Sequence, residues 1–253
     1  MKTVIVGYGR MGREVEQILK DRGHEILCRV DAAPGVGDHT EVSPEILKGA
    51  EAIIEFSLPE AVEANIKIYA QTRTPVVVGT TGWDEHKPQL GTLIEKSQGA
   101  LVYGSNFSVG AHLFFHFAEQ ASQLINEILD YDIMVTEWHH RLKKDSPSGT
   151  ALTTAERILG VSKRKTKLET GRIDGEIPLE TLHVASVRGG SIPGIHSVLL
   201  DSPADSIEIR HTARGRMGFA LGAVMAAEWL QGKTGFFSVD HFMQDFLSTS
   251  LRR

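Results

Sequence analysis

Short apolar runs alternate with amphipathic stretches through the first part of the chain. Val4–Val6 is a β-branched run, and apolar residues then recur at helical spacing from Met11 to Leu19. The same criteria predict strands at residues 25–31, 52–56, 75–78 and 100–103, and a helix at 59–71. Strands that alternate with helices are typical of a parallel sheet with right-handed crossovers. The pattern therefore predicts an α/β fold with a Rossmann-type, doubly wound parallel sheet.

The pattern changes after Val109. It predicts helices at residues 113–124, 149–159 and 214–231, strands at 131–137, 182–187, 195–200 and 206–212, and a last helix capped by Asp240. Residues 160–180 are polar and rich in turn formers, so we expect a surface loop in which Lys163, Arg164 and Lys165 are solvated. This order of elements predicts a second, α+β domain built on a mixed sheet.

A glycine-rich motif joins the first strand to the first helix. It is formed by Gly7, Tyr8, Gly9, Arg10, Met11 and Gly12. In this context Gly-x-Gly-x-x-Gly permits a tight turn, close approach of a pyrophosphate and close packing of helix on strand. Asp31 ends the second predicted strand, where a carboxylate can accept hydrogen bonds from the adenosine ribose. We therefore predict that these residues bind a nicotinamide dinucleotide.

Asp31 also bears on the choice of cofactor. Ala32 and Ala33 follow it, and no arginine stands there to accept a 2′-phosphate. A carboxylate repels that phosphate, so NADH is favoured over NADPH. Arg10 and Arg13 lie nearby in the sequence and could still accommodate NADPH, so use of either cofactor remains open.

Three further loops follow predicted parallel strands. Ligands of such folds bind beyond the carboxyl ends of the strands. The predicted cofactor-binding residues in these loops are Phe56, Ser57, Gly79, Thr80, Thr81, Ser105, Asn106 and Phe107. A simple turn would explain any one of the loops, but several small-polar loops at one sheet edge favour a cofactor groove.

The segment 137–151 contains further residues suited to proton transfer and anion binding. His139 and His140 follow a predicted strand, and a Ser-Pro-Ser-Gly-Thr turn then leads into a helix. Imidazole transfers protons readily near neutral pH, and a helix N-terminus attracts anions. A solvated basic loop is the plain alternative. A metal site is disfavoured because the histidines are adjacent and Lys143 and Lys144 would repel a cation.

The amino-acid composition excludes several classes of function. The chain has 253 residues, a net charge of −5 and a single cysteine, Cys28, within an apolar run. It has no basic excess for nucleic acid binding, no disulfide pair, and no apolar stretch long enough to cross a membrane. We expect a cytoplasmic protein with a buried thiol, no membrane association and a small-molecule substrate.

The motifs, taken in order, resemble the 4-hydroxy-tetrahydrodipicolinate reductase (dihydrodipicolinate reductase) family. The resemblance covers essentially the whole chain and is most specific over His139–Thr150. It implies a dinucleotide-binding domain at residues 1–107, completed by 218–253. It also implies that residues 108–217 bind the substrate and mediate assembly of a homotetramer through their sheet.

The resemblance also implies an activity and residue roles. Family members reduce 4-hydroxy-2,3,4,5-tetrahydrodipicolinate to tetrahydrodipicolinate with NADH or NADPH, in the diaminopimelate route to lysine. His139 matches the family's proton donor and Lys143 its second acid. The residues expected to bind the dicarboxylate substrate are His140, Ser148, Gly149 and Thr150. No metal is implied.

Two other functions remain open on the sequence alone. A different two-domain nicotinamide dehydrogenase, of the aspartate or homoserine type, would share only the first domain. A redox-sensing protein would bind the nucleotide without turnover, and would have no need for His139 and Lys143 together. Fold analogy cannot choose among these functions, whereas the chemistry of the site can.

Overall fold

The computed structural model describes residues 1–250 and divides into two compact units. The first consists of Met1–Val109 and the chain from Arg216 onward, and the second of Gly110–Gly215. The domain boundaries expected from the sequence, after residue 107 and before residue 218, lie close to these. Each unit is described by itself below.

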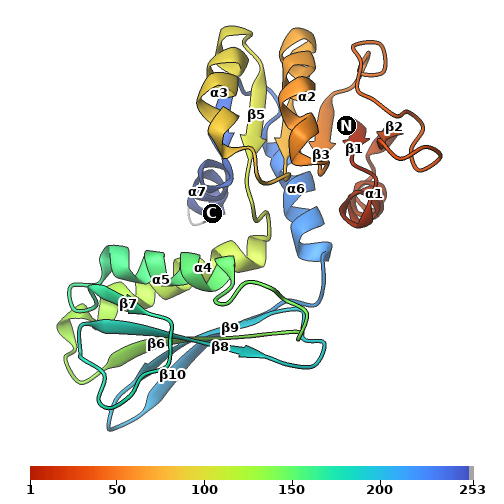
Figure 1. The fold of residues 1–253 in the computed structure, drawn as a ribbon. Coiled ribbons are helices and arrows are strands. Elements are labelled where there is room, and N and C mark those ends of the chain that lie inside the picture. The colour runs from red at the N-terminus through yellow and green to blue at the C-terminus, as the bar shows by residue number, and fades with distance from the viewer. Residues whose placement is uncertain (251–253) are drawn as a thin grey trace. The chain divides into compact units, whose positions relative to one another are not determined.

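A six-stranded parallel sheet forms the centre of the first unit (Figure 1). Its strands are β1 (Lys2–Val6), β2 (Glu25–Val30), β3 (Ala52–Glu55), β4 (Val76–Val78), β5 (Ala100–Tyr103) and β11 (Gly235–Ser238). They are ordered β11-β5-β4-β3-β1-β2, and every neighbouring pair is parallel. The chain runs outward from β1 in both directions, so the order reverses between β1 and β3. Ligands of such sheets bind at this switch point.

Helices cover both faces of this sheet. They are α1 (Arg10–Asp21), α2 (Pro59–Thr72), α3 (Lys87–Lys96), α6 (Met217–Trp229) and α7 (Val239–Ser250), with a short 3₁₀ helix at Asp84–His86. One hydrophobic core lies on the side of α1, α6 and α7, and a second on the side of α2 and α3. No helix within residues 1–250 is long and apolar enough to span a membrane. Cys28 is buried, as expected from its apolar neighbours.

Several expectations for this unit need correction. The sequence did not predict α3 or β11. Pro88 and Gly91 interrupt the apolar spacing of α3, and β11 is too short to show a period. The predicted helix at 214–231 begins only at Met217. The last helix begins at Val239, so Asp240 lies in its first turn and is not its cap.

The second unit is a five-stranded mixed sheet. Its strands are β6 (Asp132–His139), β7 (Lys167–Glu169), β8 (Thr181–Arg188), β9 (Ile195–Asp201) and β10 (Ser206–Thr212), ordered β10-β9-β6-β8-β7. The pairs β6–β8 and β7–β8 are parallel, whereas β6–β9 and β9–β10 are antiparallel. The helices α4 (Val109–Leu124) and α5 (Gly149–Val161) lie on one face of this sheet (Figure 1), and a 3₁₀ turn follows α4 at Ile125–Glu127.

The segment 160–180 is only in part the solvated loop that its composition predicts: Lys163 and most of residues 166–180 are exposed, but two features differ. It contains β7, which pairs with β8 at the sheet edge. Lys165 is only 3% exposed. Its Nζ lies 2.6 Å from Asp132 Oδ1 and donates to the Thr181 carbonyl at 2.9 Å. A run of three cations does not reveal which one turns inward, because the partner Asp132 lies far away in the sequence.

Candidate active site

The glycine motif forms the turn between β1 and α1. A Cβ at Gly7 would lie 2.1 Å from the Phe56 carbonyl oxygen, and one at Gly12 would lie 2.3 Å from the Gly7 oxygen. At Gly9 such an atom would meet nothing within 4 Å. The first and third glycines therefore allow close packing, whereas the second leaves open space at the start of α1. This arrangement fits a pyrophosphate on the helix N-terminus.

Asp31, directly after β2, stabilises this turn by hydrogen bonds. Its carboxylate accepts hydrogen bonds from the backbone N–H of Tyr8 at 2.8 Å and of Ala33 at 2.9 Å. A groove of about 570 Å³ opens beside it. The lining includes Gly7, Gly9, Asp31, Ala32, Ala33, Phe56, Ser57 and Asn65. The groove lies at the switch point of the sheet, so its position and lining suit a dinucleotide.

The other residues expected to bind the cofactor lie in different settings. Thr80, Thr81 and Ser105 line a separate cavity of about 370 Å³ at the ends of β4 and β5. The Phe107 side chain lies in the hydrophobic core, with the Phe107 carbonyl packed against Gly222, and the partly buried Met11 packs against the same core. Their roles in cofactor binding remain predictions.

The Tyr8 hydroxyl is directed away from the glycine turn, to Glu16 of α1, to which it donates a hydrogen bond. The guanidinium of Arg13 lies 4.7 Å from the centre of the Tyr8 ring. Arg10 is the first residue of α1, Gly79 packs against the Phe56 ring, and Asn106 accepts a hydrogen bond from the Ser108 N–H.

A buried carboxyl group lies next to the groove. Glu55, the last residue of β3, accepts hydrogen bonds from Ser57 Oγ at 2.5 Å, Asn65 Nδ2 at 2.8 Å and Tyr69 Oη at 2.8 Å. Burial raises the pKa of the Glu55 carboxyl and outweighs these three hydrogen bonds, which act to lower it. These three donors are uncharged, so hydrogen bonds from neutral groups of the described residues hold the loop after β3.

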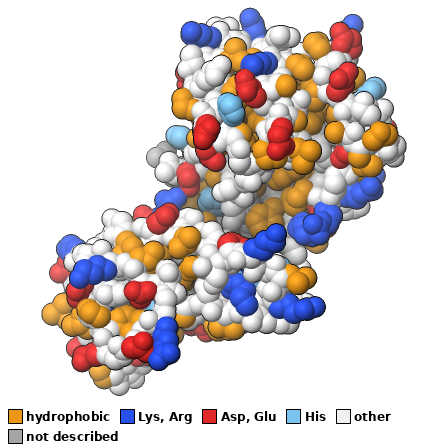
Figure 2. Space-filling view, viewed as in Figure 1, with side chains coloured by type: hydrophobic (Ala, Val, Ile, Leu, Met, Phe, Trp, Pro, Cys, Tyr) orange, Lys and Arg blue, Asp and Glu red, His pale blue; other side chains and the backbone are white. Residues whose placement is uncertain are grey.

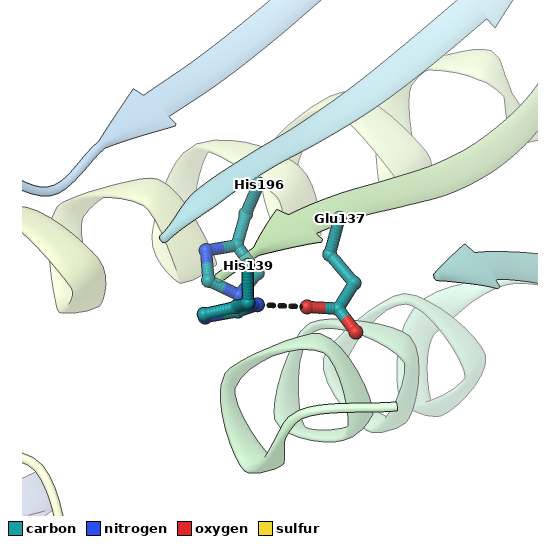
Figure 3. A group of neighbouring side chains, drawn as sticks. All are labelled: Glu137, His139 and His196. Carbon is teal, nitrogen blue, oxygen red and sulfur yellow. Dashed lines mark hydrogen bonds and ion pairs between the residues drawn. The ribbon is translucent and has the colours of Figure 1, made fainter. Parts of the chain in front are cut away.

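The second unit carries a row of polar side chains across its sheet. Glu137 of β6 lies opposite His196 of β9, and His196 lies opposite His211 of β10. Side chains alternate along a strand, so His139 points to the same face as Glu137. Figure 3 shows Glu137, His139 and His196 gathered on one side of the sheet. Apolar strands thus place three titratable groups together.

Glu137 is fully buried at the centre of this cluster. Its carboxylate contacts His139 Nδ1, and it accepts hydrogen bonds from Arg188 Nη2 at 2.7 Å and the Ser148 N–H at 3.2 Å. Burial alone would raise the pKa of the Glu137 carboxyl. The hydrogen bond from Arg188, the neighbouring Ser186 hydroxyl and the charge of His139 together outweigh burial, so this pKa lies below its usual range. Glu137 is therefore ionised at neutral pH.

His139 is the last residue of β6 and is largely buried. Burial lowers the pKa of its imidazole, the charge of Glu137 raises it, and Lys143 and Arg188 lower it further. The balance lies below the ordinary histidine value. Its Nε2 faces Gly194, where an added Cβ would lie 2.9 Å from that nitrogen. A proton on Nε2 is thus in reach of the space beside Gly194.

His196 forms the third side of the cluster. Burial and the neighbouring charge of His139 lower the pKa of its imidazole to about 4, so His196 is neutral at pH 7. Its Nε2 lies 3.0 Å from Ser148 Oγ. Ser148 is 2% exposed and also caps α5, accepting from the Ala151 N–H at 3.2 Å. The Ser148 hydroxyl is therefore engaged by two groups, and direct contact with a substrate remains a prediction.

The loop after β6 carries the other residues expected from the sequence. Lys143 Nζ lies 2.8 Å from Asp145 Oδ1, and Arg188 donates to the Asp145 carbonyl at 2.7 Å. The His140 N–H donates to the Ile192 carbonyl at 2.8 Å, which fixes the start of the loop. Thr150 and Gly149 open α5, and a Cβ at Gly149 would meet nothing within 4 Å. This open helix start suits a carboxylate.

A metal ion is the main chemical alternative for the cluster. Glu137, His139 and His196 each offer a ligand atom, and these atoms lie within 4.8 Å of one another. Arg188, however, already places a positive charge on the carboxylate. A second cation there would be repelled, so the arrangement suits proton transfer better than metal binding.

The sequence alone did not identify four of these residues as functional: Glu137, Arg188, Gly194 and His196. Extending the predicted strand from residue 137 to 139 would have placed Glu137 and His139 on one face. A histidine at 196 within an otherwise apolar strand was a second signal. Arg188 and Gly194 carry no local signal, because their roles depend on strands that pair far apart in sequence.

Comparisons with known proteins agree with this geometry. Residues 1–107 match the family model "Dihydrodipicolinate reductase, N-terminus", and residues 110–243 match "Dihydrodipicolinate reductase, C-terminus". The chain is 38% identical, over 97% of its length and 98% of the relative, to a 4-hydroxy-tetrahydrodipicolinate reductase of Christiangramia forsetii. It is 34% identical to that of Neisseria meningitidis serogroup B, over 100% of this chain and 99% of the relative.

A solved structure supports the fold. A dipicolinate-bound dihydrodipicolinate reductase from Paenisporosarcina sp. TG-14 superimposes with a TM-score of 0.76 at 22% identity. The superposition covers 94% of this chain and 97% of that one. Since both family models match and the curated relatives align from end to end, the chain belongs to the dihydrodipicolinate reductase family.

Proposed function

We propose that the protein reduces 4-hydroxy-tetrahydrodipicolinate to tetrahydrodipicolinate with NADH or NADPH. The observation that carries the proposal is the contact between the Glu137 carboxylate and His139 Nδ1, near Lys143 and the open N-terminus of α5. It occurs in a chain that aligns over its full length with relatives bearing that name. The groove at the first glycine turn supplies a place for the dinucleotide.

The residues divide the chemistry between them. A bound reduced nicotinamide supplies the hydride. His139 donates a proton from Nε2 to the ring position that becomes electron-rich, and Lys143 acts as the second acid. The positive charges of Lys143 and Arg188 favour the negative charge that develops on the ring.

Substrate binding is assigned to the start of α5. The substrate is a dianion, and backbone N–H groups at a helix N-terminus attract carboxylates. Gly149 exposes the backbone, Thr150 adds a hydroxyl, and His140 and Ser148 flank the same turn. These four residues would orient one carboxylate while His139 faces the ring.

The cofactor choice follows from Asp31. Its carboxylate lines the groove, and alanines occupy the two following positions. Arg29, the nearest arginine on β2, is already paired with Glu16 and Asp38. NADH is therefore expected to give the higher kcat/KM, with NADPH accepted less well.

We also propose a homotetramer built through the open face of the mixed sheet. On the face away from α4 and α5, Met134 lies opposite Leu199, and Trp138 lies opposite Ile195. Each is only partly buried, and Val187 is exposed. Figure 2 shows hydrophobic side chains at the surface of the same unit. Apolar side chains on an open sheet face favour a second copy as their cover. Leu199→Glu should lower the mass measured by light scattering, and an unchanged mass would refute this assembly.

A coupled assay tests the function. Aspartate semialdehyde and pyruvate are condensed in situ, and loss of NADH and of NADPH is followed separately. Turnover that needs the condensation supports the proposal. Turnover of a semialdehyde or a 2-oxo acid alone would instead indicate a different dehydrogenase. Nucleotide binding without oxidation of any metabolite would indicate a redox-sensing protein.

A further inference from the structure

The proposed chemistry rests on the contact between Glu137 and His139 but leaves the role of Glu137 in it unassigned, although Glu137 is fully buried and at the centre of the cluster. An ionised carboxylate in a protein interior destabilises the fold unless it is paired and hydrogen-bonded. Glu137 meets both conditions through Arg188, His139 and the Ser148 N–H. These contacts come from β8, from β6 itself and from the start of α5. Three elements of the fold therefore hold the Glu137 carboxylate beside the His139 imidazole.

We propose that Glu137 is a positioning residue that keeps a proton on Nδ1 of His139 and so directs Nε2, as the proton-transferring atom, to the space beside Gly194. This inference rests on the proposed function, because it assigns Glu137 its role through His139.

The first step of the argument concerns Nδ1. An ionised carboxylate can only accept hydrogen bonds, so the ring nitrogen that contacts it must carry the hydrogen. Arg188 keeps Glu137 ionised by occupying its other oxygen, Oε1, at 2.7 Å. His139 Nδ1 contacts Oε2. The proton on Nδ1 is thereby held, and any proton exchanged with a ligand must pass through Nε2.

The second step concerns the space at Nε2. This nitrogen lies near the backbone of Gly194, where an added Cβ would approach it to 2.9 Å. Any larger residue at position 194 would press on Nε2 or turn the ring. The absence of a side chain at Gly194 thus complements the hydrogen bond to Glu137 on the opposite side of the ring.

The third step concerns the charge of His139. Burial, Lys143 of the following loop, and Arg188 of β8 all disfavour the imidazolium, whereas Glu137 favours it. On β9, His196 is neutral near pH 7, and it separates His139 from His211 of β10. The α4 residue Phe114 packs near His196 and adds no charge. Glu137 is therefore the acidic group that opposes these effects and keeps the protonated form of His139 accessible.

The proton balance is simple. The Nε2–H bond of the imidazolium breaks, its electron pair stays on the ring, and the proton forms a bond to the electron-rich substrate atom. Neutral His139 keeps the hydrogen on Nδ1 and is reprotonated at Nε2 by water. Glu137 remains ionised throughout, so it changes no bond and needs no further reactant.

The first test uses the unaltered protein. Protein with ¹⁵N-labelled histidine is titrated by NMR, and the His139 signals are assigned by their loss in His139→Gln. In the neutral form, the hydrogen is expected on Nδ1. A neutral His139 with its hydrogen on Nε2 would overturn the inference. This measurement does not depend on whether a Glu137 variant folds.

The second test is a pH profile of kcat/KM for Glu137→Gln. Activity that needs protonated His139 falls as pH rises through its pKa. Loss of the Glu137 charge should move that fall to lower pH by about one unit, and lower kcat more than it raises KM. An E137Q profile that overlays the wild-type profile would contradict the positioning role.

Glu228→Gln is the matched control. Glu228 also bridges an arginine and a histidine, with Arg22 Nη2 at 2.7 Å and His24 Nε2 at 2.8 Å, but it lies in the first unit. Its pH profile should match that of the wild type. His139→Gln distinguishes failure of the proposed proton donor from failure of the positioning role of Glu137. If H139Q keeps wild-type turnover, the proton-donor assignment fails. If H139Q is impaired while the E137Q profile is unchanged, only the inference about Glu137 fails.

Discussion

Glu55 and Glu137 are two fully buried carboxyl groups, one in each unit, and they differ in electrostatic state. Glu55 accepts hydrogen bonds from a serine, an asparagine and a tyrosine, and burial raises its pKa. Glu137 has an arginine and a histidine as partners, and its pKa is lowered despite burial. Loss of solvent contact alone therefore does not determine the charge of a carboxyl group. The charge of the hydrogen-bond partners contributes as well.

The difference matches the tasks proposed for the two regions. Near the nucleotide groove, uncharged hydrogen bonds hold the loop after β3 in place without adding a strong local field. In the mixed sheet, an ionised carboxylate contacts the imidazole that is proposed to move a proton. Four predictions test this comparison, from the largest expected effect to the smallest.

Loss of either proposed acid should give the largest effect. His139→Gln or Lys143→Ala is expected to lower kcat by about 10²–10⁴-fold, the usual contribution of a positioned acid. NADH affinity, measured by fluorescence titration, should change little, because the groove lies in the first unit. Wild-type turnover in both variants would refute the assigned roles.

Glu137→Gln should strongly destabilise the fold. It removes the ionic partner of the partly buried Arg188, and breaking a fully buried pair, which sets an upper bound here, costs about 3–5 kcal/mol. The pKa of Glu137 is lowered in the folded state, so its contribution is present above the ordinary carboxyl pKa and is lost as pH falls. Urea denaturation should therefore show a larger loss at pH 6 than at pH 3, below the ordinary carboxyl pKa, and the reverse order would contradict this account.

His196 should make stability depend on pH. Its folded-state pKa is about 4, below the ordinary value of 6.5, so the unfolded chain binds the proton more readily. The free energy of unfolding should fall as pH drops from 6.5 towards 4, by at most about 3 kcal/mol. His196→Gln should flatten this slope in a series of melting curves. If the variant kept the wild-type slope, the pH dependence of stability would arise from other groups.

Glu55→Gln should have the smallest effect, about 1 kcal/mol, because the hydroxyls of Ser57 and Tyr69 can rotate to accept from the new amide. Since the folded-state pKa of Glu55 is raised, its charged form is a penalty at high pH that disappears on protonation. The stability of E55Q relative to the wild type should therefore be most favourable at high pH. E137Q should show the opposite trend, with its largest loss of stability at high pH. Identical pH trends in the two variants would remove the basis of the comparison.

Much of the architecture follows from local pattern. The strands of the parallel sheet from β1 to β5, and the helix α2, appear in the sequence as short β-branched runs and helical spacing. Elements without a clear period were missed, as for β11 and α3. Lys165 was placed in solvent because its partner Asp132 cannot be recognised from neighbouring residues.

The sequence by itself determined the glycine turn, the alternating elements and the segment that carries His139 and Lys143, because these depend on residues close together in the chain. Only the tertiary structure decided which groups surround His139. Glu137, Arg188, Gly194 and His196 meet because β6 pairs with β8 on one side and with β9 on the other. Strand register sets those contacts, and with them the charge state of the cluster, since electrostatic interactions depend on distance in space and not on separation along the chain.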